Sequence, residues 1–263
     1  MNERHIFAGL DGAPRSRKPR SSGLTMVVDW GLGAGHQNDL AATAAPYIDF
    51  AKIAVGLSRL LTGAVLVEKI EAYRAHRIEA FPGGQYLEYA QVHGKADLYL
   101  PACRRAGYRW IEVSNNVADV PLEWKVRVIE EAVSGFGMGV LGEVGKKEGL
   151  SHGPSFPDDA RACLDAGASI ILLEAAELVH ADDATCREVD ETVAAVGLDR
   201  VMFELPGPWI PGVASHHIHR MRRDLVDRFG PEVNVGNVMP DDLLSLEAYR
   251  RELGINAGKG PAS

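Results

Sequence analysis

The chain has 263 residues, of which 46% are hydrophobic and 24% charged, with a formal net charge of −8 at pH 7, and this predicts one globular domain over residues 1–263. The acidic balance argues against a nucleic-acid partner, because neutralising phosphates requires a basic surface. The chain contains no apolar run long enough to cross a bilayer and its first residues are too polar for a secretory signal, so we expect a cytoplasmic protein without a membrane partner.

The two ends of the chain are expected to add little to the fold. Residues 1–22 are interpreted as an N-terminal leader, and the dense basic run from Arg15 to Arg20 as a solvated part of it. The polar, glycine-containing tail over residues 256–263 is expected to fray. An odd number of widely spaced cysteines favours reduced thiols over a disulfide framework or a zinc site at Cys103, Cys163 and Cys186.

Short apolar runs, each followed by a polar or glycine signature, recur along the chain with helix-like segments between them. In chain order they cover residues 25–31, 50–54, 77–84, 110–114, 139–147, 170–174, 200–206 and 233–237. Eight strand–helix units in a chain of this length predict an α/β fold, the closed (β/α)8 or TIM barrel. Such barrels carry their chemistry where the strands end, so function is expected there.

Polar side chains gather at these strand ends. In the fifth run Glu143, Gly145 and Lys147 share one face, and in the fourth run Glu112 and Ser114 do the same. Five other runs each end in one polar residue: Asp29, Lys52, Glu174, Glu204 and Asn237. The pattern predicts a ring of carboxylates with at least two lysines.

Any single residue of this ring has two possible roles. It could be a solvent-exposed charge at a strand end or part of a salt bridge that supports the barrel, or it could bind a metal or a substrate. For the whole set the second is favoured, because burying several carboxylates is costly unless a metal or a substrate needs them. Oxygen ligands beside lysines suit Mg²⁺ and an anionic substrate better than zinc. The residues therefore indicate metal-assisted chemistry on a phosphate or carboxylate.

Three further motifs carry weaker signals. The loop from Gly31 to Gly35 resembles a dinucleotide-binding turn, but the required third glycine is replaced by His36, so a flexible loop is favoured. Gly236 and Asn237 stand where barrels often hold phosphate, although a turn without a ligand fits equally well. A metal or substrate role is left open for three clustered histidines: His216, His217 and His219.

The strand-end signatures together resemble those of the phosphosulfolactate synthase family. The matching blocks are RKPRSSGLTMVVD (17–29), YIDFAK (47–52), EKI (68–70), FPGG (81–84), IEVS (111–114), EVGKK (143–147), FELP (203–206) and VNVGNV (233–238). They follow in order over nearly the whole chain, and the EVGKK and PGG blocks are quite specific in combination. The chain is thereby identified as a diverged member of that family.

The resemblance implies a carbon–sulfur lyase that uses Mg²⁺ to add sulfite to phosphoenolpyruvate, both small anionic substrates. The product is (2R)-phospho-3-sulfolactate, made early in coenzyme M biosynthesis. The implied catalytic residues are Lys147 as general acid, with Glu143 and Lys52 beside it. The implied metal ligands are Glu112, Glu204, Glu174 and Asp29. Substrate-binding roles are expected for Lys146, Ser114, Gly83, Gly84, Gly236 and Asn237, and Trp30, which departs from the family pattern, is expected to line the substrate pocket.

Several positions depart from the family pattern. Together these changes remove positively charged side chains, and add apolar ones, near the strand ends where the active site is expected. Trp30 replaces a family lysine, an arginine is missing from the stretch after Glu174, and Trp209 adds an apolar group. Two alternatives to the family reaction therefore stay open. One is a diverged enzyme that joins a nucleophile to a less anionic acceptor, and the other is a catalytically silent barrel with a binding or stress-related role. A homo-oligomer is compatible with either.

Overall fold

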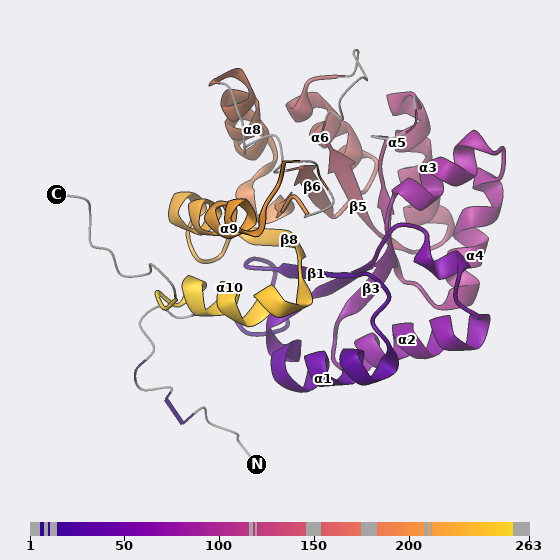
Figure 1. Ribbon diagram of the computed structural model, residues 1–263. Helices are drawn as coiled ribbons and strands as arrows, with labels where there is room; N and C mark the ends of the chain where they lie inside the picture. The colour runs from indigo at the N-terminus through magenta and orange to yellow at the C-terminus, as the bar shows by residue number, and fades with distance from the viewer. Residues whose placement is uncertain are drawn as a thin grey trace.

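The computed structural model describes residues 6–7, 10, 15–115, 118, 120–145, 154–174, 183–207, 210 and 212–254, with only the backbone described at 183–185. Parallel strands occupy its centre and helices surround them (Figure 1). The strands are β1 (Thr25–Asp29), β2 (Phe50–Ile53), β3 (Glu79–Pro82), β4 (Trp110–Val113), β5 (Gly139–Val144), β6 (Ile170–Glu174), β7 (Val201–Glu204) and β8 (Asn234–Val238). Each lies within the run predicted for it, allowing one residue at the end of β8.

The strands form one eight-stranded sheet in the order β3-β2-β1-β8-β7-β6-β5-β4. Its two edge strands, β3 and β4, lie against each other and nearly close the sheet into a barrel. The predicted TIM barrel is confirmed. Because every pair of neighbours is parallel, the carboxyl ends of all strands meet at one end of the barrel, called the mouth below.

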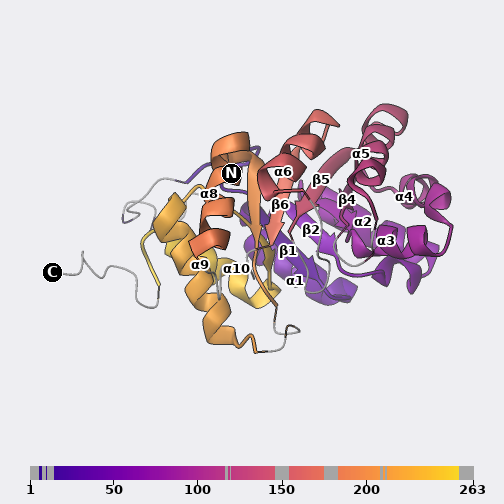
Figure 2. The ribbon, with the colours of Figure 1, turned by 90° about the horizontal axis from the view of Figure 1, so that it is seen from above.

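Helices cover the outside of the strands. In Figure 1, α1 and α2 lie along one side, and α8, α9 and α10 lie on another; Figure 2 shows the same layers from above. The helices are α1 (Ala34–Ala44), α2 (Gly63–Ala75), α3 (Gln85–Val92), α4 (Tyr99–Ala106), α5 (Leu122–Glu130), α6 (Phe156–Asp165), α8 (Asp183–Val196), α9 (Ser215–Phe229) and α10 (Leu243–Arg250). Among the described residues, no helix has the length and apolar character to span a membrane.

The two faces of the strands bury different sets of side chains. Outward residues such as Val27, Val113 and Phe203 belong to the core shared with the helices. Inward residues form a separate apolar cluster inside the barrel: Leu24, Met26, Phe50, Phe81, Leu141, Ile170, Leu172 and Met202. Alternate residues of a strand share a face, so the next inward position toward the mouth lies two residues further along. The barrel is therefore filled with apolar side chains up to the level where charged residues begin.

The basic segment before β1 packs on the barrel, and the prediction of a solvated run is wrong for Arg15 and Arg20. The Arg20 side chain is 2% exposed and its Nη2 lies 2.7 Å from Asp49 Oδ2. The Arg15 side chain is 1% exposed and pairs with Glu232 at 2.6 Å and with Glu247 at 3.4 Å. Charge along the sequence reveals the basic residues but not these partners. The expected tail over 256–263 lies outside the described residues, and all three cysteines are free thiols, as predicted.

The Arg20–Asp49 pair gives a test of this packing. Asp49 Oδ2 also accepts the backbone N–H of Thr25 at 2.9 Å. Asp49→Ala therefore leaves that N–H without its acceptor and the buried guanidinium of Arg20 without a counter-charge, bonded only to backbone carbonyls. We expect the free energy of unfolding to fall by about 3–5 kcal/mol in urea titrations. The control is Asp190→Ala, which breaks an exposed pair with Arg228 and should cost less than about 1 kcal/mol. Equal losses in the two variants would contradict the packing described.

Candidate active site

A ring of charged side chains lies directly above the apolar filling of the barrel. Lys52, Glu112, Glu143 and Glu204 are between 1% and 8% exposed, and Glu174 is half-buried. Each follows an inward apolar residue by two positions: Phe50, Trp110, Leu141, Met202 and Leu172. The pleat of parallel strands therefore turns these charges into the mouth at one level. We call these five side chains the charged ring.

Lys52 is the cation of the charged ring. Its Nζ lies 2.8 Å from Glu112 Oε2 and 3.0 Å from Glu204 Oε1. Burial lowers the pKa of Lys52, but the carboxylates of Glu112, Glu204 and Glu143 raise it by more, so it ends well above the ordinary value. Lys52 thus stays protonated at neutral pH and holds its charge in a fixed place.

One ammonium does not balance the acids around it. Burial, with added repulsion from Glu143 and Glu204, raises the pKa of Glu112 to about 8 although Lys52 opposes the shift. Burial and repulsion from Glu143 and Glu174 raise the pKa of Glu204 to about 7, again against Lys52. In the absence of a further cation, the ring therefore retains protons on carboxyl groups near neutral pH.

Three carboxylates of the ring are arranged as a candidate metal site. Glu143, Glu174 and Glu204 each offer an oxygen, and these oxygens lie within 4.8 Å of one another. A donor set made only of carboxylate oxygens suits a hard cation such as Mg²⁺ better than zinc. Burial raises the pKa of Glu204 most, and repulsion from Glu143 and Glu174 adds to it; a cation between these carboxylates would relieve that repulsion. The residues present therefore fit a divalent cation.

Glycines let the backbone approach the ring closely. The N–H of Gly84 donates to Glu112 Oε1 at 2.8 Å. A Cβ on Gly84 would lie 2.5 Å from Ser114 Oγ, and a Cβ on Gly236 would lie 2.5 Å from Met26 Cε. The Cα of Gly83 is similarly close, since a Cβ there would lie 3.3 Å from Lys52 Cε. Gly83, Gly84 and Gly236, which we expected to bind substrate, thus let the surrounding side chains and backbone pack closely at the mouth because they have no side chain.

Ser114 faces a partner that sequence reasoning missed. Its hydroxyl donates to Glu88 Oε1, and both residues are buried. The second oxygen of Glu88 accepts the backbone N–H of Ala118 at 2.6 Å, so Glu88 ties α3 to the segment that follows β4. Ser114 is thereby held in place behind the ring.

A buried salt bridge that the sequence analysis did not predict supports β5 from outside the barrel. Lys125 on α5 is fully buried, with its Nζ 2.9 Å from Asp159 Oδ1 on α6, and it also donates to the carbonyl oxygen of Glu143. The signal was present in the sequence. Lys125 follows Leu122 by three residues and precedes Ile129 by four, which places a charge on the apolar stripe of its helix.

Asp29 is separated from the charged ring. It lies on the outward face of β1, where its Oδ2 contacts Lys69 Nζ and the Tyr73 hydroxyl, both at 2.6 Å. Its Oδ1 accepts the N–H groups of Gly31 and Leu32, each at 2.8 Å. The structure thus gives Asp29 a role in holding the loop after β1 against α2, and does not bring it to Glu143.

Two other residues predicted for the site, Trp30 and Asn237, follow or end a strand, and the rest lie outside the described residues. Trp30 follows β1 and is 43% exposed. Asn237, at the end of β8, has a left-handed φ of 54°, and its buried Oδ1 has no hydrogen-bond partner within the described part of the chain. Lys146, Lys147 and Trp209 lie outside the described residues.

The three histidines are on α9. His217 Nδ1 accepts the N–H of Ala214 at 3.2 Å, and His219 Nδ1 lies 3.1 Å from Arg222 Nη2. Among the described residues, the carboxylate group at the mouth that could hold a metal includes none of the three. Local hydrogen bonds thus account for two of the histidines.

Comparisons with known proteins agree with the sequence signatures. A family profile for (2R)-phospho-3-sulfolactate synthase (ComA) matches residues 13–255. The chain is 34% identical over 251 residues to the phosphosulfolactate synthase of Methanothermobacter thermautotrophicus, covering 91% of this chain and 93% of the relative. It is 32% identical over 242 residues to the phosphosulfolactate synthase of Methanocaldococcus jannaschii, covering 88% and 92%.

Among solved structures, the chain is similar to a candidate lyase/mutase of Burkholderia cenocepacia J2315. The TM-score is 0.52 at 13% identity, with 89% of this chain and 82% of the other covered. At that identity the likeness shows the barrel fold alone.

The raised pKa of Glu112 predicts how stability depends on pH in EDTA-treated protein. The folded state holds this proton up to about pH 8, whereas the unfolded chain releases it from its ordinary value of 4.5. The free energy of unfolding should therefore fall between those values and level off above them.

Glu112→Gln removes the titrating group while keeping its shape. Relative to this variant, the wild type should lose on the order of 2–4 kcal/mol between pH 5 and pH 8, measured by urea unfolding at each pH. Parallel profiles for the two proteins would mean that Glu112 is ionised in the folded state.

Proposed function

The chain belongs to the (2R)-phospho-3-sulfolactate synthase (ComA) family, and from this premise we propose that it adds sulfite to phosphoenolpyruvate with Mg²⁺ as cofactor. The observation that carries the proposal is the charged ring, in which several buried carboxylates surround one lysine at the mouth of a barrel. Groups buried at such cost indicate a site that binds ions.

A divalent cation completes the charge balance of the ring. The four carboxylates of the charged ring exceed its one ammonium by three negative charges. A divalent cation on Glu143, Glu174 and Glu204 would offset two of them, and the proton that Glu112 keeps near neutral pH offsets the third. Mg²⁺ keeps coordination positions for water and substrate oxygens when carboxylates hold it. When bound, it supplies stabilisation of the negative charge that develops on the substrate carboxylate.

Lys52 serves as a fixed positive charge for the substrates. An ammonium has three N–H donors, and the contacts with Glu112 and Glu204 orient two of them. The third can bind an anionic oxygen of phosphoenolpyruvate. Because the lysine is held rigidly, it needs no rearrangement as negative charge grows in the transition state.

The reaction forms a C–S bond and a C–H bond, breaks the π bond of phosphoenolpyruvate and consumes one proton. The sulfur of sulfite attacks the methylene carbon of phosphoenolpyruvate, the double-bond electrons move toward the carboxylate, and a proton is then added to the carbon that bears the phosphate. We assign that proton to Lys147, whose place in the EVGKK block is only four residues beyond Glu143. The phosphate ester remains intact, so the product is a phosphomonoester.

A second candidate function rests on Trp30. This residue is 43% exposed where family members carry a lysine, which favours a less anionic acceptor at the same site. Each lost charge-assisted contact would weaken binding of the family substrate by roughly 1.5–3 kcal/mol. A catalytically silent barrel is disfavoured, because the costly ring of buried charges is retained.

Phosphorus NMR distinguishes these functions directly. Protein incubated with phosphoenolpyruvate, sulfite and Mg²⁺ should produce a new phosphomonoester resonance, which EDTA and Lys147→Ala both abolish. An unchanged spectrum from folded protein that binds Mg²⁺ by calorimetry would contradict the family reaction and favour a different acceptor. Failure to bind Mg²⁺ as well would favour the silent barrel.

Two substitutions separate the parts of the charged ring. Glu143→Gln should weaken Mg²⁺ binding in calorimetry, and Lys52→Met should lower turnover while Mg²⁺ still binds. Loss of a preorganised charged contact commonly lowers turnover by about 10²–10³-fold. Glu131→Gln, which changes an exposed glutamate on the outside of the barrel, is the matched control and should leave both measurements unchanged. Full turnover in Lys52→Met would rule out the role given to this lysine.

A further inference from the structure

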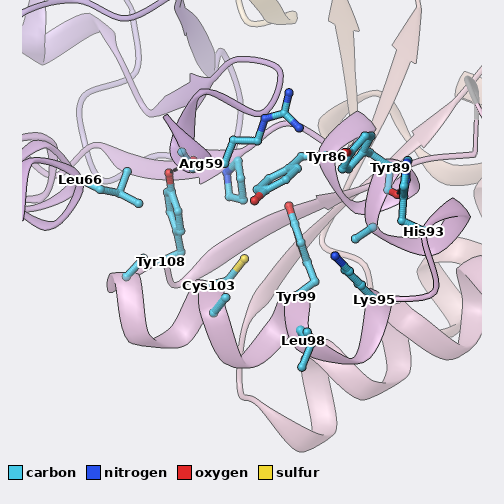
Figure 3. A pocket seen from close by; sticks show the side chains of 15 residues that line it. Arg59, Leu66, Tyr86, Tyr89, His93, Lys95, Leu98, Tyr99, Cys103 and Tyr108 are labelled. Atoms are coloured by element: carbon cyan, nitrogen blue, oxygen red, sulfur yellow. Dashed lines mark hydrogen bonds between the residues drawn. The ribbon is translucent and has the colours of Figure 1, made fainter. Parts of the chain in front are cut away.

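A pocket that the proposed reaction does not use lies outside the barrel, between α2, α3 and α4. Its volume is about 360 Å³, within the range of small-molecule sites. Figure 3 shows that aromatic side chains dominate its wall. The tyrosines that line it are Tyr86, Tyr89, Tyr99 and Tyr108. An apolar cavity of about 150 Å³ already accepts benzene, so this space can hold a substituted ring.

A buried tyrosine hydroxyl in the wall of the pocket has only a weak partner. Tyr99 is 5% exposed, and among the described residues its Oη has no hydrogen bond of normal geometry and interacts only with the Cys103 thiol. Its ring meets that of Tyr86 edge to face at a centroid distance of 5.6 Å, and Figure 3 shows the hydroxyl pointing toward Tyr86. A thiol is a weak hydrogen-bond partner, so a polar atom of a ligand would satisfy this buried hydroxyl better.

The interior of the pocket is uncharged. Tyr108 Oη lies 2.8 Å from Ser58 Oγ, so this second hydroxyl already has a partner. Burial raises the pKa of Cys103 to about 12 and raises that of Tyr99 well above its ordinary value. Both groups are therefore neutral at physiological pH, and the deep end of the pocket suits a neutral polar group.

The rim of the pocket has the opposite character. Arg59, His93 and Lys95 are exposed there, and the Arg59 guanidinium lies 5.1 Å from the centroid of the Tyr89 ring. Of the lining residues, all within the described part of the chain, none is acidic. The rim therefore favours an anionic group, and the wall favours an aromatic body between the two polar ends.

We propose that this pocket binds a small phenolic carboxylate. The aromatic ring packs against Tyr86 and Leu66, the phenol hydroxyl bonds Tyr99 Oη, and the carboxylate lies at the rim beside Arg59 and Lys95. The site is separate from the charged ring, because its walls come from the helical layer and from the outer side of β3 at Pro82. Its existence does not depend on the reaction at the mouth.

Calorimetry with three probes tests this assignment. We expect 3-(4-hydroxyphenyl)propionate to bind one site with a Kd below about 1 mM. The analogue 3-phenylpropionate should bind about fivefold more weakly, because it has no hydroxyl to bond Tyr99 Oη. Tyramine, which replaces the carboxylate by an ammonium, should bind more weakly than either. Tyr99→Phe should make the two carboxylates equal.

A filled pocket supplies the control. Ala102→Trp places a bulky side chain on an exposed lining position of α4 and should abolish saturable binding. Ala42→Trp, at an exposed position of α1 away from the pocket, should leave binding unchanged. Circular dichroism checks that both variants fold, and Tyr99→Phe tests the site even if Ala102→Trp does not fold.

Three results would overturn the proposal. The first is no saturable binding by the wild type at about 10 mM probe. The second is competition by phosphoenolpyruvate or loss of binding in Glu143→Gln, which would move the probe to the mouth. The third is a change of assembly state in Ala102→Trp without probe binding to the wild type, which would make the pocket a contact between copies of the chain.

Discussion

The need to hold several like charges inside a barrel shapes the rest of this structure. Lys52 contacts two carboxylates at 2.8 and 3.0 Å, yet Glu112 and Glu204 both keep raised pKa values. The surrounding elements therefore hold the charges in place by other means. Gly84 gives Glu112 a backbone N–H, and Lys125 binds the carbonyl of Glu143 from outside the barrel. A buried charge stays ordered only when each of its polar atoms has a partner or a ligand.

The height of the charged ring follows from the apolar layer below it. Phe50, Leu141 and Met202 close the barrel to water, and the residues two positions later are Lys52, Glu143 and Glu204. The mouth is thus a shallow polar layer on a dry base, which strengthens every electrostatic interaction within it. A register shift of one residue would turn these charges toward the helices, so strand pairing and the site are specified together.

Much of the fold and part of the site could be predicted from the sequence, for reasons that differ between residues. All eight strands follow from apolar runs, and Lys52, Glu112, Glu143, Glu174 and Glu204 meet because parallel strands end together. Asp29 stands at a strand end too, but the run TMVVD is apolar on both faces, so the sequence does not tell which face turns inward. Glu88 and Arg20 depend on partners 26 and 29 residues away along the chain, which local patterns do not reveal.

The pKa of Lys52 also separates two roles that a lysine could have in this site. Held between carboxylates, Lys52 keeps its proton well above neutral pH, so it is a poor proton donor at the moment of reaction. Its fixed charge is instead suited to binding anions and stabilising developing charge. The proposed reaction therefore needs another group to deliver its proton, one with a pKa nearer to the working pH. We assign that step to Lys147, which follows Glu143 by four residues in the EVGKK block.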